Sequence, residues 1–149
     1  MLAGELVPDF ALPDHDGELW RLSTALSRGP VVIFFYPRAL TSICTAEACH
    51  FRDLQDEFAA LGATVVGISN DSLERQRAFV HYLGSAFPIL SDQNGRVVRR
   101  FGVARKLHRI RRQTFVISPD GRVAAAIRDE FDADKHADDA LEVLRGLLR

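Results

Sequence analysis

The stretch Val31-Val32-Ile33-Phe34-Phe35-Tyr36 is a continuous run of β-branched and aromatic residues that ends at Pro37. A short run without any polar residue predicts a β-strand that is buried on both faces, as in a parallel sheet covered by helices. Ala63–Ser69 predicts a second buried strand, and Phe87–Ser91 predicts a third. We therefore expect a fold centred on a sheet of buried strands.

Helices are expected between these strands. Apolar residues recur every three or four positions from about Cys44 to Leu61, which predicts an amphipathic helix closed by Gly62. Asp71, with Glu74 three residues later, resembles a capping box and predicts the start of a second helix, which Gly84 closes. The chain thus alternates between strands and helices in its first half.

The second half predicts a change of strand direction. A short helix is expected around Gly95–Phe101, and a terminal helix from near Asp134 to Leu148. Between them, Thr114–Ser118 and Val123–Ile127 flank the turn Pro119-Asp120-Gly121, which predicts an antiparallel hairpin. The complete pattern predicts an α/β fold, a three-layer sandwich with a mixed central sheet.

Composition limits the class of protein. The chain has 149 residues, of which 47% are hydrophobic and 26% charged, so we expect a single domain over residues 1–149. The net charge of -1 gives no general attraction to nucleic acid or membrane surfaces. No apolar run is long enough to span a membrane, and Met1–Glu5 does not resemble a signal peptide. We expect a cytoplasmic protein.

The two cysteines, Cys44 and Cys49, are too few for a disulfide scaffold or a complete zinc site. Cys44 follows the strand and loop and lies at the expected start of a helix. Free backbone N–H groups and the helix dipole at such a position stabilise a thiolate. The alternative is an inert cysteine packed in the core.

The spacing of the two cysteines constrains their chemistry. On an intact helix, Cys49 lies ~7.5 Å further along the axis than Cys44 and points ~140° away from it. Two α-carbons this far apart exceed the ~7 Å limit for a disulfide. A bond between them therefore requires the helix to unwind, and the alternative is that Cys49 only packs under the helix.

The motif Pro37-x-x-x-Thr41-x-x-Cys44 resembles the active-site signature of the peroxiredoxins. The pattern Cys44-Thr45-x-Glu47-x-Cys49 is similar to that of the Q-type subgroup, also called bacterioferritin comigratory protein. Further tripeptides follow in the order of the family, namely Pro8-Asp9-Phe10, Gly67-Ile68-Ser69, Leu90-Ser91-Asp92 and Phe101-Gly102-Val103. The resemblance covers nearly the whole chain.

This resemblance implies a thioredoxin-like fold and the reduction of hydroperoxides. Cys44 matches the peroxidatic cysteine, and Cys49 matches the resolving cysteine that forms an intramolecular disulfide with it. Thr41 matches the residue whose hydroxyl hydrogen-bonds the sulfur and the peroxide. Arg112 matches the guanidinium that stabilises thiolate and developing oxygen charge, and Pro37 matches the residue that shapes and shields the loop.

The resemblance also implies hydrogen peroxide and organic hydroperoxides as substrates and thioredoxin or a similar dithiol as the reductant. It implies a monomer, because the disulfide is intramolecular, and it calls for no cofactor and no metal. The alternative on the same fold is a non-catalytic redox sensor or binding protein that uses the Cys44–Cys49 switch. The presence of Thr41 and Arg112 favours the enzyme, because a simple switch needs neither.

Other residues close to the two cysteines also bear on the site. Ser42-Ile43 stands where most members have Pro-Gly, and Ile43 resists positive φ, so any left-handed conformation there would be strained. Glu47 is expected to interact with the helix dipole and to oppose thiolate formation. His50 could bind a metal only if other ligands gather by folding.

The segment before Arg112 is basic, and it is shorter than in many Q-type members. It contains Arg105, Lys106, His108, Arg109 and Arg111. The segment lacks aromatic residues for base stacking, so we expect a solvated loop and no nucleic-acid partner.

Overall fold

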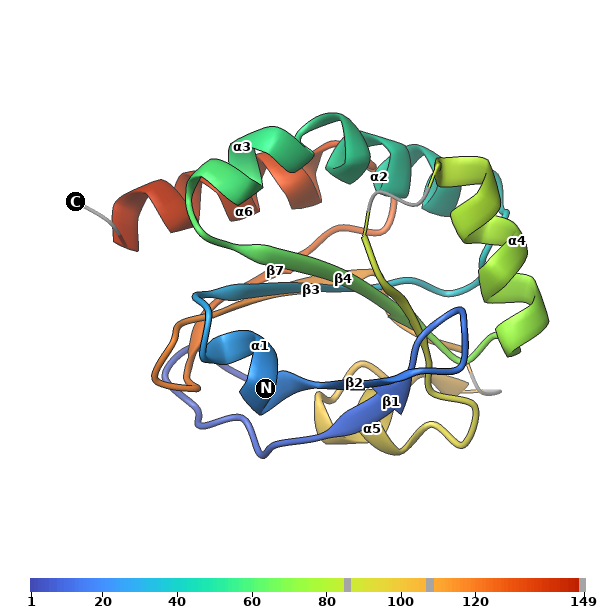
Figure 1. Cartoon of the computed structure of the whole chain (residues 1–149), viewed down its shortest axis with the longest axis horizontal. Coiled ribbons are helices and arrows are strands. Elements are labelled where there is room, and N and C mark those ends of the chain that lie inside the picture. Colours follow the sequence, from blue (N-terminus) through green and yellow to red (C-terminus); the bar gives the residue numbers. More distant parts are fainter. Residues whose placement is uncertain (85–86, 107–108, 148–149) are drawn as a thin grey trace.

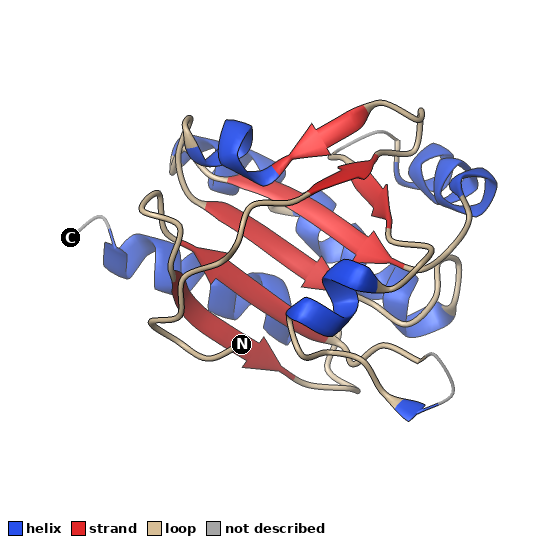
Figure 2. Ribbon diagram, turned by 90° about the horizontal axis from the view of Figure 1, so that it is seen from below, coloured by secondary structure: helices blue, strands red, loops and turns tan. Residues whose placement is uncertain are grey.

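The computed structural model describes residues 1–84, 87–106 and 109–147, and its centre is a five-stranded mixed sheet (Figures 1 and 2). The strand order is β5-β4-β3-β6-β7. The strands are β3 (Val31–Phe35), β4 (Thr64–Ser69), β5 (Ile89–Ser91), β6 (Gln113–Ile117) and β7 (Val123–Arg128). The first three are mutually parallel, whereas β6 runs antiparallel to β3 and β7 antiparallel to β6, which confirms the mixed sheet.

Two further layers cover the faces of this sheet (Figure 1). The helices on one face are α2 (Ser42–Asp53), α3 (Gln55–Ala60), α4 (Leu73–Leu83) and α6 (Lys135–Leu147). The elements on the other face are the antiparallel pair β1 (Ala11–Pro13) and β2 (Leu19–Arg21) with α1 (Leu22–Leu26) and α5 (Arg96–Arg100). No helix of the described residues is long and apolar enough to cross a membrane.

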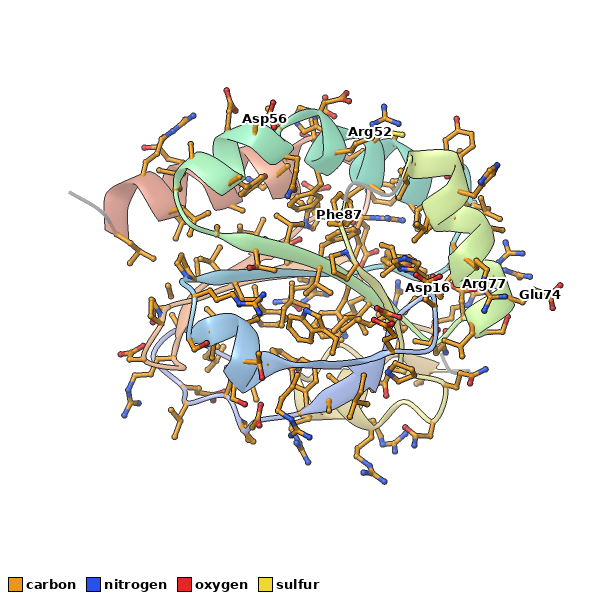
Figure 3. The ribbon with its side chains drawn as sticks, viewed as in Figure 1. Asp16, Arg52, Asp56, Glu74, Arg77 and Phe87 are labelled. Atoms are coloured by element: carbon orange, nitrogen blue, oxygen red, sulfur yellow. The ribbon has the colours of Figure 1, made fainter. Side chains whose placement is uncertain are left out.

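The central strand β3 supplies both halves of the core. Its five residues are all fully buried, as the apolar run predicts. Val32 and Phe34 pack with the helices of one layer, whereas Ile33 and Phe35 pack on the opposite face, because neighbouring side chains of a strand alternate. Figure 3 shows Phe87 between the helices and the sheet, while charged side chains such as Glu74 point outward.

The structure departs from the expected elements at three places. The helix expected over Cys44–Leu61 is divided into α2 and α3 at Leu54, where φ is -97° and ψ is 8°. The sequence does not indicate this break, because the helical spacing of apolar residues continues across it. The short elements β2 and α1 were not predicted. The N-cap of α4 is Ser72, whose hydroxyl accepts a hydrogen bond from the backbone N–H of Arg75, and not Asp71.

Candidate active site

Cys44 lies where the sequence places it, in the first turn of a helix that follows a buried strand. The strand β3 ends at Phe35, a loop follows, and Thr41 is the N-cap of α2. The first helical hydrogen bond runs from the N–H of Thr45 to the carbonyl of Thr41. The preceding N–H groups therefore have no intrahelical acceptor and point toward the helix start. Cys44 is 1% exposed.

Sheet register brings Arg112 to this cysteine across a large sequence separation. Because β6 is antiparallel to β3, Gln113 at the start of β6 lies opposite Phe35 at the end of β3. Arg112 directly precedes β6 and therefore lies beside the loop that follows β3. Its Nη1 donates a hydrogen bond to Cys44 Sγ at 3.1 Å. The structure thus brings Cys44 and Arg112 together.

Glu130 holds the guanidinium of Arg112 in place. The Nε of Arg112 donates to the backbone carbonyl of Glu130 at 3.3 Å, and the backbone N–H of Arg112 faces both carboxylate oxygens of Glu130 at 3.3 and 3.4 Å. Arg112 is only 5% exposed. Its orientation toward the sulfur is therefore fixed by contacts with the segment after β7, which sequence reasoning did not identify.

Thr41 and Pro37 flank the cysteine on the loop side. The Thr41 hydroxyl donates a hydrogen bond to the carbonyl of Arg38 at 2.7 Å, and the side chain is exposed. Pro37 is half-buried and comes two residues after the last residue of β3. Both residues lie between the end of β3 and Cys44, and the Thr41 hydroxyl bonds the loop backbone and not the sulfur.

Two residues of the next βα connection anchor this loop. The carboxylate of Asp71 accepts a hydrogen bond from the N–H of Ala39 at 2.8 Å. Arg75 donates to the carbonyl of Ala39 at 2.6 Å and pairs with Asp71 at 3.2 Å. Sequence reasoning assigned Asp71 to a helix cap and missed this role. The spacing of Asp71 and Arg75, four residues apart, was the available signal for the ion pair but not for its target.

The left-handed residue of the loop is Leu40, with a φ of 66°, and not Ile43. Ile43 lies in the first turn of α2, where its branched side chain is compatible with helical angles. The replacement of Pro-Gly by Ser42-Ile43 is therefore accommodated within the helix. The backbone strain of an L-residue at positive φ falls one residue before the N-cap instead.

Cys49 lies on the same uninterrupted helix as Cys44. Both thiols are free, and Cys49 is partly buried against the core. Five residues of intact helix separate their α-carbons by roughly 7.5 Å along the axis, beyond the reach of a disulfide. The structure is therefore that of the folded, dithiol form.

Glu47 is not the solvated dipole residue that the sequence suggested. Its side chain is fully buried, and neither carboxyl oxygen has a hydrogen-bond partner among the described residues. Burial raises the pKa of Glu47 to about 8, although Arg112 lowers it and Glu130 raises it further. At neutral pH the group is mainly uncharged, so it does not oppose a thiolate at Cys44 as expected.

His50 pairs with one acidic residue in the first turn of α6 and with another just before that helix. Its Nε2 lies 2.7 Å from a carboxylate oxygen of Asp138, and its Nδ1 lies 3.8 Å from Asp134. This pairing ties α2 to α6 on the surface. No group of three or more His, Cys, Asp or Glu side chains that could hold a metal ion occurs among the residues that the structure describes.

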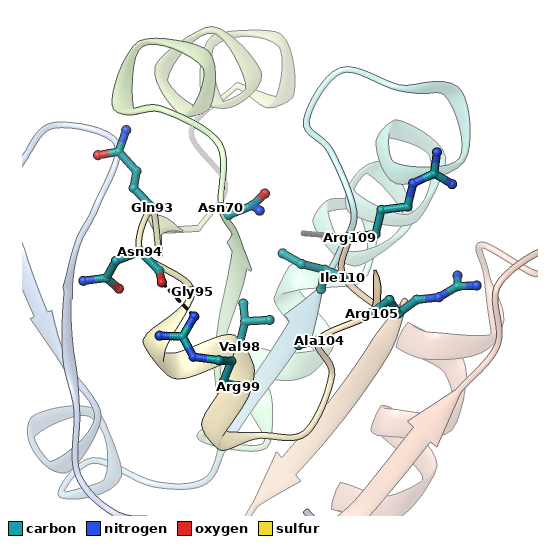
Figure 4. Close-up of a pocket in the computed structure, with 10 residues that line it drawn as sticks. All are labelled: Asn70, Gln93, Asn94, Gly95, Val98, Arg99, Ala104, Arg105, Arg109 and Ile110. Atoms are coloured by element: carbon teal, nitrogen blue, oxygen red, sulfur yellow. Dashed lines mark hydrogen bonds between the residues drawn. The ribbon is translucent and has the colours of Figure 1, made fainter. Parts of the chain in front are cut away.

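The basic side chains described between Gly102 and Arg112 are wholly or partly exposed, unlike that of Arg112. Arg105, Lys106 and Arg109 are exposed, and Arg111 is half-buried, whereas His108 lies outside the described residues. Figure 4 shows Arg105 and Arg109 at one side of a cavity of about 390 Å³. Cys44 does not line this cavity.

Known proteins resemble this chain over most of its length. A profile of the AhpC/TSA family matches residues 3–126. A putative peroxiredoxin of Mycobacterium tuberculosis is 50% identical over 99% of this chain and 98% of its own length. A chloroplastic peroxiredoxin Q of Sedum lineare is 38% identical over 97% of this chain and 78% of its own length.

Solved structures show the same likeness in three dimensions. The crystal structure of the peroxidoxin BcpB of Mycobacterium tuberculosis matches with a TM-score of 0.96 and 49% identity, covering 99% of this chain and 98% of that one. A bacterioferritin comigratory protein of Xanthomonas campestris matches with a TM-score of 0.86 and 32% identity, covering 94% of this chain and 92% of that one.

The fold is therefore thioredoxin-like, and the family that it matches supports a thiol peroxidase activity. The chain belongs to the AhpC/TSA family, the peroxiredoxins, and its relatives include proteins named peroxiredoxin Q and bacterioferritin comigratory protein.

Proposed function

We propose that this chain reduces hydrogen peroxide and organic hydroperoxides through Cys44, forms a Cys44–Cys49 disulfide and is recycled by thioredoxin or a similar dithiol. The observation that carries the proposal is the hydrogen bond from Arg112 to Cys44 Sγ at 3.1 Å, in the first turn of α2. A buried guanidinium and free N–H groups together favour negative charge on the sulfur.

In the first step, the Cys44 thiolate attacks one oxygen of the peroxide, and the O–O bond breaks. The sulfur becomes a sulfenic acid, and the other oxygen takes up a proton and leaves as water or an alcohol. Arg112 is positioned to stabilise the charge that passes from sulfur to oxygen. Thr41 orients the peroxide through its hydroxyl, which in the resting protein bonds Arg38. Pro37 shields the sulfenic acid from water.

In the second step, the Cys49 thiol condenses with the sulfenic acid, and a disulfide and water form. Because both cysteines lie on the intact helix α2, this step requires the first turns of α2 to unwind. A dithiol then reduces the bond by exchange and becomes oxidised itself. Because the bond is intramolecular, resolution needs no second copy of the chain, and we propose that the protein acts as a monomer, located in the cytoplasm.

Peroxide turnover with a thioredoxin system tests this proposal. The native chain is expected to consume hydrogen peroxide and an organic hydroperoxide in repeated cycles, and Cys44→Ser is expected to abolish consumption. Cys49→Ser is expected to permit one turnover and then stop with thioredoxin. Unchanged consumption by Cys44→Ser would contradict the enzyme. A disulfide that forms once without turnover would favour the redox sensor instead.

A further inference from the structure

Glu47 occupies a special position on the segment that must unwind. It lies three residues after Cys44 and two residues before Cys49, within the uninterrupted helix α2. Any unwinding that brings the two sulfurs together includes the backbone between them. The surroundings of Glu47 therefore change whenever the proposed disulfide forms.

In the folded helix, the Glu47 carboxyl is enclosed without hydrogen bonds. The side chain is fully buried, and both oxygens lack a partner among the described residues. The Nε2 of His136 lies 3.4 Å from Glu47 Oε2. A buried charge without partners is strongly unfavourable, whereas a neutral carboxyl costs much less.

His136 on α6 does not supply the missing charge. Its Nε2 lies 2.8 Å from the carbonyl of Asp129, which can only accept, so Nε2 carries a proton. Its Nδ1 lies 2.8 Å from the Thr114 hydroxyl and accepts from it. Burial also lowers the pKa of His136, with Arg112 acting in the same direction. The 3.4 Å contact with Glu47 therefore joins two neutral groups at pH 7.

The other charges around Glu47 come from three elements. Arg112, before β6, is the neighbouring cation, but its guanidinium is already engaged by Cys44 Sγ and by the carbonyl of Glu130. The Glu130 carboxylate, after β7, repels a charge on Glu47. A thiolate at Cys44 on α2 itself would do the same. Arg105, also before β6, lies 3.9 Å from the Glu130 carboxylate. Arg112 and Arg105 thus already face two anions, the Glu130 carboxylate and a Cys44 thiolate. A third anion at Glu47 would be uncompensated, so the folded site retains a proton on Glu47.

We propose that Glu47 is a proton latch on α2: its protonated carboxyl holds the helix folded around Cys44, and unwinding releases that proton to water. The proposal rests on the Cys44–Cys49 disulfide proposed above. The condensation of sulfenic acid with thiol forms the disulfide and one water molecule, and the Glu47 proton leaves in addition. Glu47 acts here as a positioning residue, because it does not touch the sulfur or the peroxide.

The direction of the pH effect follows from the two pKa values. The folded carboxyl titrates near 8 and the exposed one near 4.5. Protonation therefore stabilises the folded helix fully below pH 4.5, and this stabilisation is lost as pH rises toward 8. His136 acts oppositely below about pH 6.5, where exposure of its imidazole favours protonation. The window from pH 6.5 to 8 isolates the contribution of Glu47.

Proton release on disulfide formation tests the latch. At pH 7, the native chain is expected to release about one more proton per disulfide than Glu47→Gln when both are oxidised by one equivalent of hydrogen peroxide. A pH indicator records the protons and mass spectrometry records the disulfide. The matched control Asp53→Asn, an exposed carboxylate at the end of the same helix, should release as many protons as the native chain. Equal release by Glu47→Gln and the native chain would overturn the latch.

Hydrogen exchange provides a second readout that needs no disulfide. In a Cys49→Ser background, the opening constant of residues 42–53 is compared with and without Glu47→Gln at each pH. The opening constant of the chain that keeps Glu47, divided by that of Glu47→Gln, is expected to rise about tenfold between pH 6.5 and 8. A ratio that does not change with pH would contradict the latch. If the Glu47→Gln variant does not fold, Glu47→Met, which introduces an uncharged side chain of similar size, is used in its place. If no Cys44–Cys49 disulfide forms but the ratio of opening constants still rises with pH, the proposed function is wrong and the latch is supported.

Discussion

The Nη1 of Arg112 lies 3.1 Å from the sulfur of Cys44, although 68 positions separate the two residues in the chain. The antiparallel pairing of β3 with β6 produces this contact, and Glu130 maintains it through both its carbonyl and its carboxylate. The cation beside Cys44 is therefore positioned by the sheet framework and not by a surface loop. Its position depends on the fold more than on any local motif.

Replacement of Arg112 by Lys is expected to slow the oxidation of Cys44 by hydrogen peroxide about 10²–10³-fold, in the range found when one transition-state donor is lost. Lys keeps the charge but lacks the planar set of donors with which Arg112 bonds both Cys44 Sγ and the Glu130 carbonyl. Stopped-flow measurement of Cys44 oxidation provides the rate. The neighbouring substitution Arg111→Lys serves as the control and should leave the rate within about twofold of the native value. A native rate in Arg112→Lys would show that the guanidinium geometry is not required.

Asp71→Ala is expected to loosen the loop before Cys44. The substitution leaves the buried N–H of Ala39 without its acceptor and breaks the pair with Arg75, at a cost of about 1–3 kcal/mol in unfolding free energy. The rate of Cys44 oxidation should fall about tenfold to a hundredfold, because the loop no longer holds its geometry. Urea unfolding and stopped-flow kinetics measure the two effects. Glu74→Ala, an exposed neighbour, should change neither.

Gly67→Ala tests how tightly β4 is packed. A Cβ at this position would lie 2.7 Å from Cζ of Phe34 and 2.8 Å from Cδ1 of Ile89. We expect a loss of about 1–3 kcal/mol in unfolding free energy from overpacking. Gly146→Ala in α6 meets nothing within 4 Å and should gain up to about 1 kcal/mol from helix propensity. Equal stabilities of the two variants in urea would contradict the packing described here.

The pH dependence of stability should change in His136→Asn. Burial lowers the pKa of the folded imidazole, whereas the unfolded chain titrates near 6.5. Stability from this group is therefore present above pH 6.5 and is lost as pH falls through the lowered folded value. Glu47 changes stability in the opposite sense over this range, equally in both chains, so the comparison is between the two chains. From pH 7.5 to pH 5, the unfolding free energy measured in urea should rise more, or fall less, in His136→Asn than in the native chain. His81→Asn, at an exposed position of α4, should retain the native difference; an unchanged difference in His136→Asn would contradict this assignment.

The sequence predicted the sheet and its directions because strong local signals encode them. The apolar run of β3 is unambiguous, and Pro119-Asp120-Gly121 fixes the turn between β6 and β7. The break at Leu54 was missed because it involves one residue within a continuous apolar pattern. The three-residue strand β2 was missed because it is too short for a periodic signal.

The sequence identified the two residues at the centre of the candidate site but not the residues that hold them. Cys44 and Arg112 were both identified from family motifs, and the structure brings them into contact. The anchoring of Ala39 by Asp71, and the full burial of Glu47, depend on elements that meet only after folding. Local patterns therefore assigned Asp71 and Glu47 to helix capping and dipole interactions, which compete with tertiary contacts for the same residue types.

Peptide mass mapping after oxidation tests directly whether peroxide joins Cys44 and Cys49 in a disulfide. Reduced protein is treated with one equivalent of hydrogen peroxide, the remaining thiols are blocked, and the digested peptides are weighed. We predict a peptide in which Cys44 and Cys49 are joined, with the loss of two hydrogen masses, and its disappearance on treatment with reduced thioredoxin. Recovery of Cys44 as the free thiol, with the peroxide left unreduced, would contradict the proposed peroxidase function.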